Sequence, residues 1–203
     1  MPEHPPTKIK IARIITRMDL GGAQRAVLHL SQSLDPGRFE QTVITGDGGL
    51  LLAELSAIPS IRHYVVPDLT RPIGLRAAWN DIQSARKICE ILRSFKPDVV
   101  HTHTPKAGIV GRWAAKLAGV PRVVHTYHGF GFSPRHPAWQ RAFYVGVERA
   151  TARITSQFVV VSEPNRVLGQ SYGIFRREQC VLIRSGVEFS DYRAANVAKP
   201  QKK

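Results

Sequence analysis

The segment from residue 97 to residue 132 constrains the fold of this chain more than any other part. It contains two short runs that are typical of buried strands, Asp98–Thr102 and Arg122–Tyr127. The residues between them favour a helix, because Pro105 suits its first turn and Gly119 suits its end. Two strands joined by a helix form a βαβ unit, whose crossover is almost always right-handed. The segment therefore predicts two neighbouring parallel strands.

Polar residues gather where both of these strands end. His101 and His103 come from the first strand, and His125 and His128 come from the second. Thr104 directly follows the first strand, and its hydroxyl can cap the next helix. In open α/β sheets, ligands bind at the carboxyl ends of the strands. The histidines therefore mark this edge of the sheet as the candidate site.

The rest of the chain repeats the alternation of strand and helix. We expect further strands at Lys8–Thr16, Gln41–Thr45, Ile61–Val66, Gln157–Ser162 and Val181–Arg184, and further helices from Gly21 or Gly22 to Leu34 and at Leu50–Ala57, Gly74–Phe95, Pro137–Ile154 and Glu163–Gln170. Such alternation predicts an α/β fold with a single Rossmann-like, doubly wound parallel sheet and helices on both faces. We expect this domain to span residues 8–189, between a disordered tail at 1–7 and a polar tail at 190–203.

Three of the expected helices carry apolar residues at helical spacing, which predicts that these residues face the core. The stripes are Ala23, Ala26, Val27, Leu30 and Leu34 in the first helix, Leu75, Ala78, Trp79, Ile82, Ala85, Cys89 and Leu92 in the long helix, and Trp139, Phe143, Ala150 and Ile154 in the helix at 137–154.

The helix at 137–154 allows a second interpretation. Arginines, among them Arg141, flank its apolar stripe, and a helix of this kind can lie on an acidic lipid surface. The pattern is more often typical of a helix that packs on a sheet and keeps its arginines in water. Trp139 and Arg141 are the candidate residues for membrane docking.

The composition describes an ordered protein with a strong basic excess. Hydrophobic residues make up 43% and charged residues 22% of the 203 residues, which argues against disorder. Lys and Arg number 29 against 15 Asp and Glu, so the net charge is +14, which suggests an anionic partner. Because the basic residues are spread along the chain and no nucleic-acid-binding motif occurs, we expect this partner to be an anionic membrane surface or a phosphorylated ligand and not nucleic acid.

The location of the protein is suggested by its cysteines and its N-terminus. Cys89 and Cys180 form no CxxC motif, which indicates buried thiols in a reducing compartment. The N-terminus is too polar for a signal peptide, and no apolar run approaches the roughly 20 residues that cross a bilayer. We therefore expect a cytoplasmic protein, peripheral on the inner face of the cell membrane.

The pair Gly21–Gly22 stands where the first strand gives way to a helix. Free N–H groups at a helix start favour a phosphate, and glycine lets a ligand approach the backbone. A simple tight turn explains the pair equally well. The fingerprint GxGxxG is missing after this strand, so a nicotinamide dinucleotide cofactor is not expected.

Four parts of the chain together resemble the N-terminal half of family 4 glycosyltransferases: IARIITRMDLGGAQRAVLHL, VVHTHTPKAGIVGRWAAKLAGVPRVVHTYHGFGF, FVVVSE and VLIRSGVEF. The resemblance covers Ile9 to Phe189. It implies one half of a GT-B fold, in which two Rossmann-like domains face a cleft and sugar is transferred with retention. Similar runs occur in enzymes that extend bacterial surface polysaccharides, with a nucleotide-sugar donor and a polyprenyl-diphosphate-linked or glycan acceptor.

The resemblance also implies roles for individual residues. Gly21 and Gly22 match the glycine loop that approaches the donor diphosphate. His128 matches the histidine that reaches the donor sugar and the reaction centre, so it is the candidate catalytic residue. His103 and Lys106 would line the cleft near the acceptor or a phosphate.

Two further features concern the end of the chain. Ser162 and Glu163 match the end of the last cleft-facing strand, whereas Arg184 and Ser185 stand where the family usually has Pro and Asn. The family's second domain carries two glutamates eight residues apart, and no glutamate follows Tyr192. We therefore expect an acceptor-side domain that needs a donor-binding half, which a separate subunit could supply, and no sugar transfer by the chain alone. No cofactor is implied.

The residues are compatible with two other functions. HxH on a strand places His101 and His103 on one face, and His125 with His128 could complete a metal site. A metal-dependent hydrolase would also need a carboxylate near the strand ends, and Asp19 is the candidate. The second alternative is a non-catalytic module that docks on a membrane or on a partner.

Overall fold

The computed structural model describes residues 7–70, 75–133 and 135–186. The strands are β1 (Ile9–Ile15), β2 (Phe39–Thr45), β3 (Ile61–Val65), β4 (Val99–His103), β5 (Arg122–Tyr127), β6 (Gln157–Val160) and β7 (Cys180–Leu182). The helices are α1 (Gly22–Ser33), α2 (Leu52–Ser56), α3 (Leu75–Phe95), α4 (Pro105–Leu117), α5 (Ala138–Ala152) and α6 (Glu163–Ser171), with a 3₁₀ turn η1 at Arg177–Gln179. Every predicted strand and helix is present, with ends that differ by a few residues.

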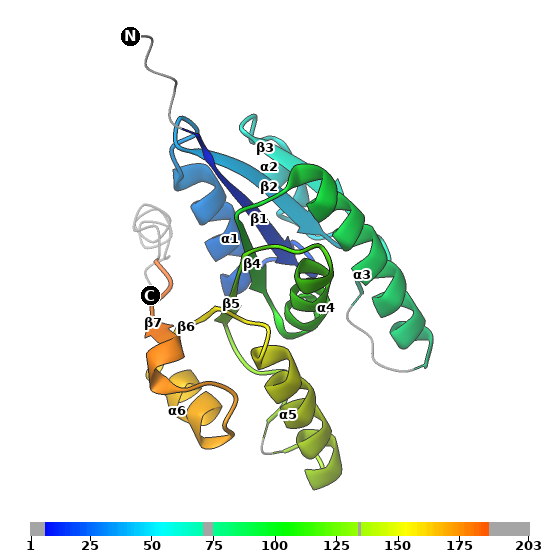
Figure 1. Cartoon of the computed structure of the whole chain (residues 1–203), viewed down its shortest axis with the longest axis vertical. Coiled ribbons are helices and arrows are strands. Elements are labelled where there is room, and N and C mark those ends of the chain that lie inside the picture. Colours follow the sequence, from blue (N-terminus) through cyan, green and yellow to red (C-terminus); the bar gives the residue numbers. More distant parts are fainter. Residues whose placement is uncertain (1–6, 71–74, 134, 187–203) are drawn as a thin grey trace, which may run out of the picture.

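The seven strands form one parallel sheet in the order β3-β2-β1-β4-β5-β6-β7 (Figure 1). The predicted doubly wound parallel sheet is therefore confirmed. The chain builds outward from β1 to β3 and then returns to place β4 on the other side of β1. The strand order reverses between β1 and β4, and such a switch point is where open α/β sheets bind ligands.

Some predictions concern residues outside the described ranges. These are the two predicted tails apart from Thr7, the helix start at Gly74 and the domain end at 187–189.

Alternation along the strands separates two layers of helices. Ala12 and Ile14 of β1 pack in the hydrophobic cluster that includes α3 and α4. Ile15 packs on the other face, with Val27 of α1 and Leu55 of α2. Successive strand residues point to opposite faces, so both sides of the central strand are buried. The prediction of helices on both faces is confirmed.

The apolar stripe predicted for α3 is wrong at its N-terminal end. Trp79 and Ile82 are 61% and 53% exposed. The buried residues there and further along the helix are Ala77, Ser84, Ile88, Cys89, Ile91, Leu92 and Phe95. A 21-residue helix is about 31 Å long, whereas a five-residue strand spans about 17 Å. The N-terminal turns of α3 therefore extend beyond the sheet, as Figure 1 shows.

The stripe predicted for α5 is also wrong, because the helix is rotated. Trp139 and Phe143 are 74% and 61% exposed, whereas Val145, Glu148 and Thr151 are buried. Polar contacts with α4 hold the helix in this rotation, since Arg112 pairs with Glu148 and Trp113 donates to Thr151.

The stripe predicted for α1 is right only for Val27. The other buried residues of this helix are Gln24, Leu28 and Ser31. The remaining predicted residues are half-buried: Ala23, Ala26, Leu30 and Leu34. The two cysteines are buried free thiols, as predicted.

Candidate functional site

Hydrogen bonds join the carboxyl ends of the three central strands. The hydroxyl of Thr16, after β1, lies 2.8 Å from that of Thr104, after β4. Nδ1 of His103, the last residue of β4, lies 3.2 Å from Nε2 of His128, directly after β5. We call these four residues the carboxyl edge. They lie at the switch point and at the edge predicted from the histidines.

Thr104 does not cap α4 in the way predicted. Its hydroxyl donates to the carbonyl of His103 at 2.5 Å, and its φ is +64°, a conformation that is unusual for threonine. The hydroxyl of Thr16 instead accepts from the amide of Ala107 in the first turn of α4 at 3.3 Å. A side chain directly after β1 therefore caps a helix about 90 residues away in sequence. Backbone strain of this kind is found at ligand sites, where the surrounding structure holds it in place.

The glycine pair lies at the start of α1. Gly21 is the N-cap in an extended conformation and, as a glycine, has no side chain that could cap the helix. A Cβ at Gly22 would meet nothing within 4 Å, whereas a Cβ at Gly21 would come within 2.7 Å of Oε1 of Gln24. The first amides of a helix have no partner within the helix, so the start of this 12-residue helix can bind an anion. The geometry thus allows the predicted phosphate contact.

The sequence interpretation missed the loop that supports this glycine pair. Gly49 has φ +115°, and a Cβ there would overlap the backbone of Met18. The amide of Leu51 donates to the carbonyl of Met18 at 2.8 Å, and that of Gly46 donates to Thr16 at 2.9 Å. The loops after β1 and β2 are thus joined backbone to backbone. The run GDGG was the available signal, because clustered glycines mark positions of close approach.

The two histidines of the carboxyl edge are uncharged near neutral pH. His103 is buried and His128 is half-buried. Burial lowers the pKa of His128 to about 4. Burial also lowers the pKa of His103 well below its ordinary value, and repulsion from the protonated forms of His101 and His128 and from Arg13 lowers it further. This pair therefore offers hydrogen bonds rather than formal charge.

His125 does not belong to the carboxyl edge. Its register partner is Thr102, so it faces α4, whereas His103 pairs with Thr126 on the opposite face. Nδ1 of His125 lies 2.8 Å from the hydroxyl of Thr102, and a Cβ at Gly108 of α4 would overlap its ring. The four predicted histidines are therefore split between two faces.

This split removes the proposed four-histidine metal site. In the described parts of the chain, no three His, Cys, Asp or Glu residues are placed to hold a metal ion. His101 instead bonds the hydroxyl of Thr126 at 2.7 Å. Asp19, the carboxylate that a hydrolase would need, pairs with Arg17 at 3.3 Å. The geometry does not support the hydrolase alternative.

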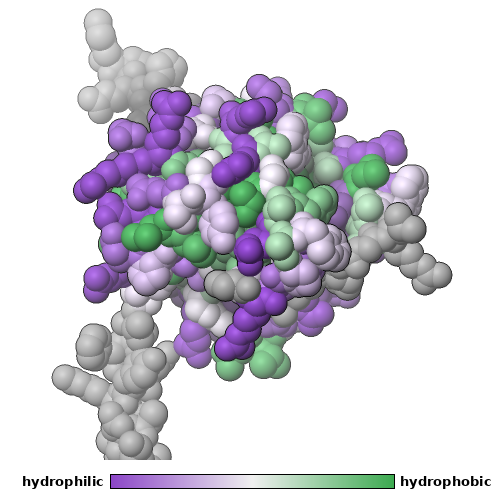
Figure 2. All heavy atoms as spheres, turned by 90° about the horizontal axis from the view of Figure 1, so that it is seen from below, coloured by the Kyte–Doolittle hydropathy of each residue, from purple (hydrophilic) through white to green (hydrophobic). Residues whose placement is uncertain are grey.

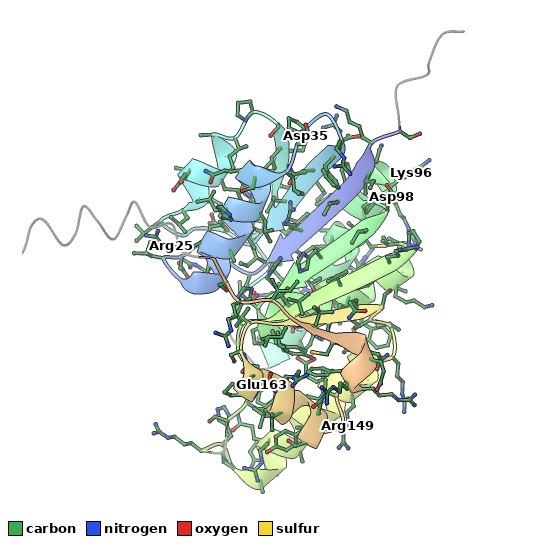
Figure 3. All side chains as sticks on the ribbon, turned by 90° about the vertical axis from the view of Figure 1, so that its left-hand side faces the viewer. Arg25, Asp35, Lys96, Asp98, Arg149 and Glu163 are labelled. Carbon is green, nitrogen blue, oxygen red and sulfur yellow. The ribbon has the colours of Figure 1, made fainter. Side chains whose placement is uncertain are left out.

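The other predicted site residues lie around the carboxyl edge. Nζ of Lys106 lies 2.6 Å from Oδ2 of Asp81 on α3, so this lysine leans towards α3. The hydroxyl of Ser162 caps α6 by accepting from the amide of Asn165 at 3.4 Å. Glu163 pairs with Arg166 of the same helix. Figure 3, which labels Arg25 and Glu163, shows α1 and α6 on either side of the strand ends.

A buried ionic network lies behind the edge. Nη2 of Arg112 is 2.7 Å from Oε2 of Glu148, which also accepts from the hydroxyl of Tyr127 at 2.7 Å. The ring of Tyr127 stacks on Phe130 at 4.4 Å, and Phe130 contacts Phe132 at 5.2 Å. These contacts fix the loop that carries His128. Arg112 and Glu148 were not identified from sequence, because lone charged residues in helices usually face water.

The profile of the family described as Glycosyltransferase Family 4 matches residues 20–191. Over 160 residues, the chain is 36% identical to a UDP-Gal:alpha-D-GlcNAc-diphosphoundecaprenol alpha-1,3-galactosyltransferase of Escherichia coli. This match covers 79% of the chain and 40% of the galactosyltransferase, so the chain spans about two fifths of that relative's length.

Solved structures share the fold. A sucrose-phosphate synthase of Thermosynechococcus elongatus aligns with 95% of this chain and 53% of its own, with a TM-score of 0.70 and 18% identity. A glycosyltransferase of Rickettsia africae aligns with 93% of this chain and 46% of its own, with a TM-score of 0.64 and 21% identity. In both cases the described fold corresponds to about half of the larger protein.

Proposed function

Since the chain belongs to Glycosyltransferase Family 4, we propose that its carboxyl edge forms one wall of a site that transfers a sugar from a nucleotide-sugar donor. The observation that carries this proposal is the line of hydrogen bonds from Thr16 through Thr104 and from His103 to His128. These bonds hold the ends of β1, β4 and β5 together. The open start of α1 and the imidazole of His128 therefore serve one site.

The proposed donor site uses the start of α1. The diphosphate of a nucleotide sugar carries negative charge, which the amides and the dipole at a helix N-terminus stabilise. The glycine pair allows this group to approach the backbone, as the open space at Gly22 indicates. His128 lies two strands away and would contact the sugar. His103 supports His128, and Ser162 and Glu163 border the same edge.

The proposed acceptor is linked to a polyprenyl diphosphate. The galactosyltransferase of Escherichia coli acts, by its description, on GlcNAc-diphosphoundecaprenol. We place the acceptor on the α3 side of the carboxyl edge, where Lys106 lies. Its pairing with Asp81 keeps the ammonium in a fixed position.

Sugar transfer requires a second wall that holds the donor against the acceptor. Such positioning supplies about 7–11 kcal/mol of the activation barrier. The chain spans about two fifths of the galactosyltransferase. We therefore propose that a donor-binding half, in one polypeptide or in a separate subunit, completes the enzyme. The 203 residues alone should show weak nucleotide binding and no transfer.

The decisive experiment combines this chain with a donor-binding half from the same source. Transfer of labelled galactose from UDP-galactose to GlcNAc-diphosphoundecaprenol is measured for the mixture and for each half. We expect transfer only in the mixture. Transfer by the 203-residue chain alone would contradict the need for a second wall. A folded mixture that transfers none of a panel of nucleotide sugars would contradict the proposed function.

We further propose that the edge rests on an anionic membrane surface, where a polyprenyl-linked acceptor is found. Trp139 and Phe143 of α5 and Trp79 and Ile82 of α3 are exposed. All four lie in N-terminal turns, which point to the same edge as the carboxyl ends of the strands (Figure 1). Seen from below, Figure 2 shows hydrophobic side chains scattered between hydrophilic ones on this face. No helix within the described ranges is long and apolar enough to cross a bilayer.

Vesicle binding tests this docking surface. A net charge of +14 predicts co-sedimentation with anionic vesicles that weakens as salt is added, and little binding to neutral vesicles. Replacing Trp139 and Phe143 by Ala should reduce the binding. Leu117→Ala is the matched control. Leu117 is 62% exposed but lies at the C-terminal end of α4, away from the N-terminal turns that carry the proposed docking surface. Arg141 is half-buried, so we expect its replacement to have the smaller effect. Equal binding to both kinds of vesicle would contradict electrostatic docking.

A further inference from the structure

The pair formed by His103 and His128 contains one buried nitrogen without a partner. Nδ1 of His103 lies 3.2 Å from Nε2 of His128, so one of these two atoms must donate a proton to the other. Nε2 of His103 is buried and has no hydrogen-bond partner among the described residues. The side chain of His103 is only 1% exposed. The partnerless nitrogen decides between the two possible directions of the bond.

Each direction assigns a different state to the partnerless nitrogen. If His128 donated, a neutral His103 would carry its proton on Nε2, as a buried N–H group without an acceptor. If His103 donates through Nδ1, its Nε2 carries only a lone pair. Buried N–H groups without partners are rarer than acceptors without partners. The second direction therefore fits the structure better.

The surroundings of His103 favour its neutral state. The ring of His101 lies 4.1 Å from it, centroid to centroid. Arg13 of β1, which pairs in register with His101, is 2% exposed and donates to Gln41 at 2.6 Å. The charged groups that shift the pKa of His103 are all histidines or arginines. A second proton on His103 would place another cation beside Arg13 without a counter-ion.

We infer that His103 is a positioning residue, which donates through Nδ1 to Nε2 of His128 and so fixes the proton of His128 on its own Nδ1. His128 then presents an N–H group, and not a lone pair, at the carboxyl edge. Its ligand would be an oxygen that accepts a hydrogen bond, such as a sugar hydroxyl or a phosphate oxygen. Only this ligand assignment rests on the proposed function, because the tautomer is a property of the chain without a ligand.

Nitrogen NMR of the imidazole rings tests the inference without an activity assay. In the wild-type 203-residue chain at neutral pH, we expect the signals of His128 to show a protonated Nδ1 and an unprotonated Nε2. His103 should show the same pattern. A protonated Nε2 on His128 would overturn the inference, and this result would leave sugar transfer untouched. The wild-type spectrum is sufficient, so the test does not depend on a variant that folds.

Two substitutions separate positioning from packing. The amide nitrogen of Asn can take the place of Nδ1, so His103→Asn should keep the proton of His128 on Nδ1. His103→Leu removes the donor, and His128 should then shift towards the Nε2–H form that free histidine prefers in water. Thr126→Val is the matched control, because it removes the partner of His101 and leaves the His103–His128 bond intact. A tautomer of His128 that is unchanged in a folded His103→Leu variant would contradict the inference.

Discussion

The same two strands hold histidines in opposite ways on their two sides. On the face covered by α4, His125 lies beneath Gly108, bonds Thr102 and belongs to a packed region that includes Arg112 and Glu148. We call this region the α4 interface. At the carboxyl edge, His103 and His128 bond each other and leave one buried nitrogen without a partner. Burial lowers the histidine pKa in both regions, so a shifted pKa does not distinguish a site from a core.

The difference lies in how fully each region satisfies its polar groups. At the α4 interface, Arg112 donates to Gly108, Thr155 and Glu148, and Tyr127 also donates to Glu148. At the carboxyl edge, a strained Thr104 and a partnerless imidazole nitrogen are held in place by hydrogen bonds between strands. Incomplete satisfaction of a buried group calls for an explanation, and a ligand at this edge supplies one. The following substitutions test whether the two regions are separate in stability and in activity.

The largest effect is expected at the α4 interface. Glu148→Gln should lower the free energy of unfolding by about 3–5 kcal/mol, because it leaves the buried Arg112 charge without a counter-ion. Urea denaturation measures the loss. Glu163→Gln is the matched control, since Glu163 forms an exposed pair with Arg166 and should cost no more than about 1 kcal/mol. Equal losses in the two variants would contradict the distinction between a packed interface and the edge.

The carboxyl edge should respond in activity rather than in stability. In an enzyme completed by a donor-binding half, His128→Ala should reduce the rate of transfer by about 10²- to 10³-fold, through loss of a hydrogen bond to developing charge. Its free energy of unfolding should fall by only about 1–3 kcal/mol, because the buried His103 loses its hydrogen-bond partner. His125→Ala should give the reverse pattern, with the larger loss of stability. Near-normal transfer by His128→Ala would place the reaction centre elsewhere.

Two glycines sharpen the comparison further. A Cβ at Gly108 would overlap the ring of His125, so Gly108→Ala should destabilise the protein by about 1–3 kcal/mol. Gly146 of α5 has nothing within 4 Å of its Cβ position. Gly146→Ala should therefore stabilise the protein by up to about 1 kcal/mol through helix propensity. Thermal unfolding of both variants measures the signs, and two shifts of the same sign would contradict close packing on His125.

A further effect is expected in the pH dependence of stability. The folded-state pKa of His125 and of His128 lies below the ordinary value of about 6.5. Below about pH 6.5 the unfolded chain binds protons that the folded chain does not, so stability is full above this pH and falls as the pH decreases towards 4. Each such histidine contributes about 1.4 kcal/mol per pH unit to this slope.

The same measurement compares the two histidines directly. Between about pH 6 and pH 5, His125→Asn and His128→Asn should each reduce the slope by most of one histidine's contribution. Only His128→Asn should reduce sugar transfer. Urea denaturation at several pH values provides the slopes. An unchanged slope in either variant would mean that the replaced histidine is as easily protonated in the folded chain as in the unfolded chain.

Sequence periodicity identified the strands well and the buried helix faces less well. Short runs of β-branched residues located every strand, because a buried parallel strand is apolar on both faces. Apolar spacing in α3 and α5 predicted buried faces that include Trp79 and Trp139, and both side chains are exposed. The spacing shows that a helix is amphipathic, but it does not show how far the helix extends past the sheet. It also cannot show which polar partner rotates the helix.

By itself, the sequence determined the parallel sheet, the order of its elements and the edge where the histidines gather. These follow from local patterns and from the right-handed βαβ crossover, which need no knowledge of distant contacts. The tertiary structure decided which histidine serves the edge and which lies beneath α4. It also joined Thr16 to Thr104, 88 residues apart, and His103 to His128, 25 residues apart. Such bonds depend on strand register and on the height at which each strand ends, and these are set only when the strands pair.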